Sequence, residues 1–112
     1  MAMLQERTLE ALRSAVEYCG YDMGEIMERH NRKRVFSDLR SIVWTIYCDS
    51  LHASPARASA AFGWDRTTIH CALAKARDLR TTDRFFADMY DSILGAFNAI
   101  GAEDALEEKN NN

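Results

Sequence analysis

A short run of hydrogen-bonding side chains, Arg66, Thr67 and Thr68, follows Asp65 in the middle of the chain. Arginine can donate two hydrogen bonds to O6 and N7 of a guanine, whereas threonine can bond to a phosphate or offer its methyl group to a thymine. Aspartate is a residue type that caps the free amides at the start of a helix. The four residues together predict a helix whose first turn can contact DNA.

The rest of that helix has a surface suited to the major groove. Its apolar face holds Ile69, Ala72, Leu73, Ala76 and Leu79. Its opposite face holds small or hydrogen-bonding side chains, Thr67, His70, Cys71 and Ala74. The first acidic residue after Asp65 is Asp78. A carboxylate in the groove is repelled by phosphates unless it meets a base amino group, so this pattern favours a DNA-reading helix and adds His70 to its candidate contacts.

The residues before this helix predict its partner and place a helix-turn-helix over about residues 54–80. Ser54 and Pro55 form a strong helix start, because serine caps free amides and proline suits the first helical position. Gly63 follows where a left-handed residue ends a helix. Two helices joined by a tight turn have the required layout. Trp64 lies in that turn, where it can pack against the protein or contact DNA.

Apolar spacing predicts four further helices, over about residues 3–19, 22–27, 37–51 and 82–100. Asp22, Ser37 or Asp38, and Thr81 or Thr82 are the expected starts of the last three. The predicted fold class is all-α, a compact helical domain of about six helices that contains the helix-turn-helix. One domain is expected over residues 1–100, followed by a flexible acidic and polar tail over 101–112.

Charge is distributed unevenly along the chain. The formal net charge is -3, yet eleven of the fourteen basic residues and only five of the seventeen acidic residues lie between Arg29 and Arg84. A local field acts at a groove, so a basic centre between acidic flanks can still hold phosphates. The basic loop of Arg32, Lys33 and Arg34 is the densest part of this centre. Lys75 is a candidate phosphate contact, with a solvated surface side chain as the alternative.

Other classes of protein find little support in the sequence. Cys19, Cys48 and Cys71 are widely separated and odd in number, which indicates a reduced, cytoplasmic protein rather than a disulfide or zinc framework. The three histidines fall in different segments without a nucleophile or a carboxylate pair, so no enzyme, metal site or cofactor is predicted. Neither a signal peptide nor a membrane span is indicated.

The turn and the second helix resemble a known signature. The run Phe62-Gly63-Trp64-Asp65-Arg66-Thr67-Thr68-Ile69, followed by Ala72 and Lys75, is similar to F-G-G-R-D-H-T-T-V-x-H-A-x-x-K. That run belongs to the C-terminal DNA-binding domain of the bacterial replication initiator DnaA. The similarity covers about residues 15–97 and implies the all-α fold of that domain and of the Trp repressor. The phosphate-loop motif of the initiator's ATPase domain is absent, so a free-standing relative is expected.

The resemblance implies roles for matching residues. Arg32 would enter the minor groove, and Arg40 would touch a phosphate at the start of its helix. Asp65, Thr67 and Thr68 would lie in the major groove.

The sequence also departs from the family in the turn. Trp64 stands where the family has a base-reading arginine, Arg66 replaces its histidine, and the turn is one residue shorter. The preferred DNA sequence is therefore expected to differ from the initiator's.

These features predict sequence-specific binding of double-stranded DNA, in the regulation of replication initiation or of transcription. A homodimer or contact with other replication or regulatory proteins would suit that role, whereas a membrane or a small-molecule substrate would not. The alternative is a helical protein-interaction module on the same scaffold, in which the acidic end helices, Met23 and Met27 contact a partner. Salt dependence distinguishes the two, because a DNA binder loses affinity steeply as salt rises.

Overall fold

The structure is a computed structural model that describes the backbone of residues 2–110 and the side chains of residues 3–102. The described residues form six α-helices and no strand, as the sequence predicted. The helices are α1 (Ala2–Tyr18), α2 (Met23–Ile26), α3 (Arg34–Leu51), α4 (Pro55–Phe62), α5 (Arg66–Thr82) and α6 (Arg84–Asn110). None of the helices described is long and apolar enough to cross a membrane.

Helix α3 is the centre of the molecule. Every residue from Asp38 to Cys48 is buried, and the helix contacts each of the other five. Its polar side chains are accommodated locally, since the Ser41 and Thr45 hydroxyls donate to the carbonyls of Ser37 and Ser41 at 3.0 and 2.7 Å. Because eleven successive buried residues cover every face of a helix, α3 is enclosed by its neighbours over this stretch.

The caps that the sequence predicted for α2, α4 and α5 are confirmed. Asp22 accepts a hydrogen bond from the Glu25 amide at 2.9 Å. Ser54 accepts from the Arg57 amide at 3.3 Å, and Asp65 accepts from the Thr68 amide at 3.1 Å. Gly63 has φ of 70° and ends α4 in the left-handed region. The boundaries of the helix-turn-helix are therefore set by local sequence.

Three boundaries differ from the sequence-based prediction. Helix α3 begins at Arg34, before the predicted Ser37 or Asp38. Helix α5 continues through Thr82, and Asp83 caps α6 by accepting from the Phe86 amide at 3.1 Å. Thr81 and Thr82 instead donate their hydroxyls to the Asp78 carbonyl, each at 2.9 Å.

Helix α6 also extends further than predicted. It continues beyond Gly101 to Asn110, within the stretch where a flexible tail was predicted. Residues 111–112 of that tail lie outside the described residues.

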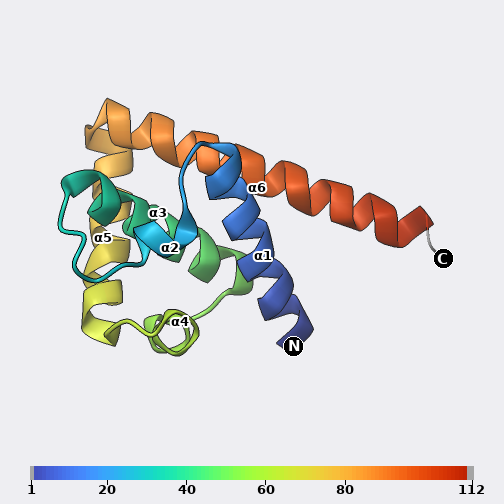
Figure 1. The fold of residues 1–112 in the computed structure, drawn as a ribbon, viewed down its shortest axis with the longest axis horizontal. Coiled ribbons are helices and arrows are strands. Elements are labelled where there is room, and N and C mark those ends of the chain that lie inside the picture. Colours follow the sequence, from blue (N-terminus) through green and yellow to red (C-terminus); the bar gives the residue numbers. More distant parts are fainter. Residues whose placement is uncertain (1, 111–112) are drawn as a thin grey trace.

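The helices place the helix-turn-helix at one end of the molecule. Helix α5 forms one side of the fold, and the loop between α2 and α3 runs beside it (Figure 1). Helix α1 lies on the other side of α3, packed against α6, whose C-terminal half projects past the rest of the chain (Figure 1). The loop runs from the α4–α5 turn, where Arg29 meets Gly63, to the end of α5, where Arg34 meets Asp83.

Candidate nucleic-acid interface

Helices α4 and α5 are joined by a rigid turn. Ala58 of α4 and Ile69, Leu73 and Ala76 of α5 are buried in the common core. The Ser59 hydroxyl donates to the carbonyl of Trp64, which ties the turn back onto α4. Since the turn is bonded to the helix that precedes it, the start of α5 has a fixed direction relative to α4.

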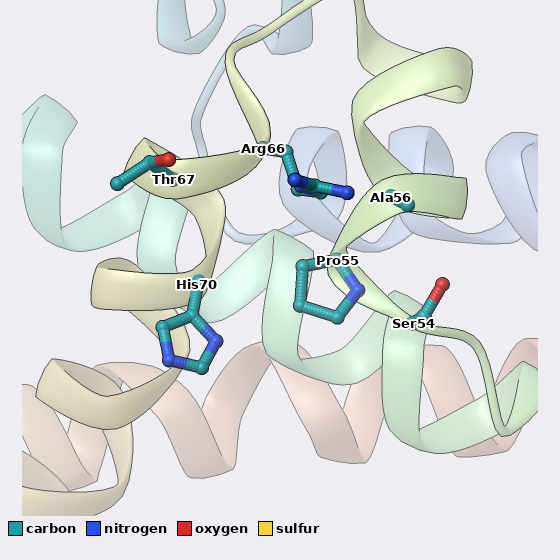
Figure 2. Close-up of a pocket in the computed structure, with 6 residues that line it drawn as sticks. All are labelled: Ser54, Pro55, Ala56, Arg66, Thr67 and His70. Carbon is teal, nitrogen blue, oxygen red and sulfur yellow. The ribbon is translucent and has the colours of Figure 1, made fainter.

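The outer surface of α5 is uncharged over its first turns, apart from Arg66. The exposed residues there are Arg66, Thr67, Thr68, His70, Cys71 and Ala74. Arg66, Thr67 and His70 line a shallow depression together with Ser54, Pro55 and Ala56 at the start of α4, and Arg66 and His70 extend toward α4 (Figure 2). No carboxylate occurs between Asp65 and Asp78. This surface can therefore approach a polyanion closely.

Asp65 and Thr68 form a cap rather than two separate contacts. The Asp65 carboxylate accepts from the Thr68 amide, and the Thr68 hydroxyl lies 3.4 Å from the same oxygen. The carboxylate is thus occupied by the helix start. Because Asp65 is exposed, its second oxygen stays open to solvent or to a base amino group.

Lys75 has an internal role that the sequence did not reveal. Its ammonium nitrogen lies 3.0 Å from Oδ1 of Asp38 and donates to the Ser37 hydroxyl at 3.1 Å. Lys75 and Asp38 form an ion pair and not a hydrogen bond, because Oδ1 of Asp38 accepts no hydrogen bond. Asp38 is nearly buried, with 12% of its side chain exposed, so this lysine joins α5 to α3.

The basic loop divides into fixed and open residues. Arg34 lies 3.3 Å from Asp83 and 3.7 Å from Asp38, which anchors the loop at the start of α3. Arg32 and Lys33 are exposed, and within the described residues the side chain of neither makes a hydrogen bond or an ion pair. These two cations are the ones that can reach a ligand without breaking an existing contact.

Arg40 is built into the protein and is not positioned as a surface phosphate contact. It is only 8% exposed, and its guanidinium donates to the carbonyls of Ile26 and Asn31 at 3.0 and 3.2 Å. Removal from water lowers the pKa of this guanidinium. The role implied by the family resemblance is therefore replaced by a structural one, because α3 is covered at this point by α2 and the loop.

Trp64 likewise packs inward. Its indole N–H donates to the Met27 carbonyl at 3.2 Å, and its ring meets Trp44 edge-on with centroids 5.3 Å apart. The side chain is half-buried, and its polar atom already has a partner. Of the two roles that the sequence left open, packing of the turn is the one the geometry favours.

Arg29 is a residue of this region that sequence reasoning did not single out. Its guanidinium donates to the Gly63 carbonyl and lies over the Trp64 ring, 5.6 Å from the centroid. The two partners are more than thirty positions away in the chain. No local spacing could have indicated this contact.

The site contains no arrangement suited to a metal ion. Within the described part of the chain, no group of three or more histidine, cysteine, aspartate or glutamate side chains could hold a metal. Comparisons of the chain with protein-family models, with curated proteins and with solved structures find no match.

Proposed function

We propose that the protein binds double-stranded DNA in a sequence-specific manner through the helix-turn-helix of α4 and α5. One observation carries the proposal: the first turns of α5 present an exposed surface that is free of carboxylates after the Asp65 cap. The basic loop lies along the same helix and meets its C-terminal end, where Arg34 pairs with Asp83. Major-groove binding needs such a surface, and phosphate binding needs nearby cations. The similarity of residues 62–75 to the DnaA signature supports the same function.

The arrangement assigns different tasks to different residues. Thr67, His70 and Arg66 would face base edges, because they are exposed on the first turns of α5. The exposed N-terminus of α4 would take a phosphate, since the positive end of a helix dipole favours an anion and Arg66 lies beside it (Figure 2). Arg32 and Lys33 would contact the backbone or the adjacent minor groove.

The biological role proposed is regulation of replication initiation or of transcription. Both need the same contacts, namely a specific site occupied by a small protein. A domain with one helix-turn-helix gains useful affinity from paired sites or from a dimer.

A helical protein-interaction module is the second candidate. Exposed apolar side chains away from α5 favour it, since Phe85 is 89% and Tyr18 is 84% exposed. Tyr18 also lines a groove with Gly95, Ala99 and Ile100 of α6. Met23 is buried and Met27 is half-buried, so the expectation that these methionines are exposed to a partner is wrong for Met23. Scattered exposed apolar residues are also common on monomers, so this candidate carries less weight.

Selection of binding sites from random duplexes, followed by fluorescence anisotropy at low and physiological salt, tests the proposal. The expected result is a recovered consensus and an affinity that falls steeply with salt. Absence of binding even at low salt would reject the function. Binding without any recovered consensus would reject its sequence specificity.

A further inference from the structure

Trp64 lies at the junction between the turn of the helix-turn-helix and the basic loop. Two guanidinium groups lie over its ring, that of Arg40 at 4.9 Å and that of Arg29 at 5.6 Å from the centroid. Trp44 supports the ring edge-on from within α3. A guanidinium over an aromatic ring is attracted to it, and the attraction is stronger where the cation is removed from water, as Arg40 is at 8% exposure.

The same three side chains hold the backbone that leads into the loop. Trp64 donates to the carbonyl of Met27 and Arg40 donates to those of Ile26 and Asn31. In the reverse direction, Arg29 reaches from the loop to the carbonyl of Gly63. The loop and the turn are thus bonded to each other reciprocally, although they are remote in sequence.

The loop is consequently fixed on both sides of its open cations. Asn31 is held by Arg40, and Arg34 is held by Asp38 and Asp83. Only Arg32 and Lys33 lie between these points. A segment held in its binding conformation loses less conformational entropy when it meets a ligand.

We propose that Arg29, Trp64 and Arg40 form a clamp that sets the distance between the loop cations and the first turn of α5. This inference rests on the proposed function. It adds that the DNA site has two parts at a fixed spacing, of which the loop contacts one and α5 contacts the other. Trp64 is a positioning residue in this arrangement. It acts through the loop and does not touch a base.

Double-mutant cycles on the selected consensus duplex test the clamp. Arg29→Met and Trp64→Leu weaken it, Arg32→Ala reports the loop contact, and Arg66→Ala reports the α5 contact. In the wild-type background Arg32→Ala is expected to cost about tenfold in affinity, and in either clamp variant less than about threefold. The cost of Arg66→Ala is expected to be the same in every background, because α5 is held by α4 and the core.

Two further measurements separate the clamp from general effects. Amide hydrogen exchange of His30 and Asn31, whose amides donate to Glu28, is expected to accelerate without DNA in both clamp variants, while that of α3 does not. Arg13→Met removes an exposed arginine from α1 and serves as the charge-matched control, with no coupling to Arg32→Ala expected. If Trp64→Leu does not fold, the exposed Arg29 still provides a usable variant.

The outcomes distinguish the two proposals. Costs of Arg32→Ala that are equal in all backgrounds, or loop exchange that is unchanged, would overturn the clamp while leaving DNA binding intact. Failure of the wild-type protein to bind any duplex would overturn the proposed function and the clamp together. The clamp is supported if Arg32→Ala is coupled to the clamp variants, Arg66→Ala is not, and amide hydrogen exchange in the loop is faster in those variants.

Discussion

The ammonium group of Lys75 lies 3.0 Å from the carboxylate of Asp38, so a cation of α5 is paired with a nearly buried carboxylate of α3. A lysine also closes the DnaA signature that residues 62–75 resemble. In this chain the side chain joins two helices of the core. Substitution of Lys75 is therefore expected to lower the free energy of unfolding more than it lowers the affinity for DNA.

Lys75→Met is expected to lower the free energy of unfolding by about 1–2 kcal/mol, because it leaves the nearly buried Asp38 carboxylate without its closest cation. Chemical denaturation measures the change. Arg77→Met, at an exposed arginine on the same helix, is the matched control and should alter stability little. A Lys75→Met protein of wild-type stability but with a reduced salt slope for DNA binding would instead identify Lys75 as a phosphate contact.

Arg40→Ala is expected to destabilise the fold by about 2–4 kcal/mol, because the carbonyls of Ile26 and Asn31 lose their donor and the Trp64 ring loses a neighbour. Thermal unfolding measures it. Arg40→Lys should recover only part of the loss, since one ammonium cannot reproduce the planar contact with the ring. Full stability of Arg40→Ala with uniformly weaker DNA binding would restore the surface phosphate contact that the resemblance implied.

Arg66→Ala is expected to reduce affinity for the selected consensus by about tenfold or more, with a much smaller effect on random duplexes, because a bidentate guanine contact discriminates by about 1–3 kcal/mol. Anisotropy titrations with both duplexes measure the difference. Arg84→Ala, another exposed arginine but on α6, is the control for loss of charge. A loss of equal size on both duplexes, together with a shallower salt slope, would place Arg66 on a phosphate beside the start of α4.

Ala74→Glu is expected to weaken DNA binding by about tenfold or more, because it places a carboxylate on the outer face of α5 and like charges at an interface cost several kcal/mol. The helix should tolerate glutamate at this exposed position. Asn98→Glu adds the same charge on α6 and should leave binding almost unchanged. Equal affinities of the two variants would move the DNA-binding surface away from α5.

Stability is expected to fall in alkaline solution. Burial, reinforced by Asp49, raises the pKa of the Cys48 thiol, and burial also raises the pKa of Cys19, Tyr47 and Tyr90. The folded chain keeps these protons to a higher pH than the unfolded chain does. The stability that these protonated groups give to the folded chain is therefore complete below the ordinary thiol pKa of about 8.5, and it is lost as the pH rises above that value.

Cys48→Ala should show a smaller decline in unfolding free energy between about pH 8 and pH 10 than the wild type, because one of these thiols is removed. Urea denaturation across that range measures the decline. Cys71→Ala changes an exposed thiol and should follow the wild-type curve. Parallel curves for all three proteins would assign the decline to other groups.

The sequence by itself determined the elements of this protein where the signal is local. Four helix-end signals each act within four residues, so they can be predicted from the sequence without knowledge of the fold. They are the caps at Asp22, Ser54 and Asp65 and the left-handed Gly63. The exposed surface of α5 was predicted for the same reason, because helical spacing alone separates its apolar face from its polar face. The start of α3 and the cap of α6 were misplaced. Arg34, the first residue of α3, pairs with Asp83 across the fold, whereas Asp83 caps α6 through the nearby Phe86 amide, a local signal that the prediction missed.

Only the tertiary structure decided which basic and aromatic residues are open to a ligand. A charge count treats Arg29, Arg32, Arg40 and Lys75 alike. In the fold, Arg32 is open, whereas the other three are bonded to carbonyls or to a carboxylate. The residues that pair with them lie on other elements or loops, from 9 to 38 positions away. The physical reason is that burial and pairing of a long cationic side chain depend on which remote residues pack against it. The spacing of residues along the sequence does not give that information.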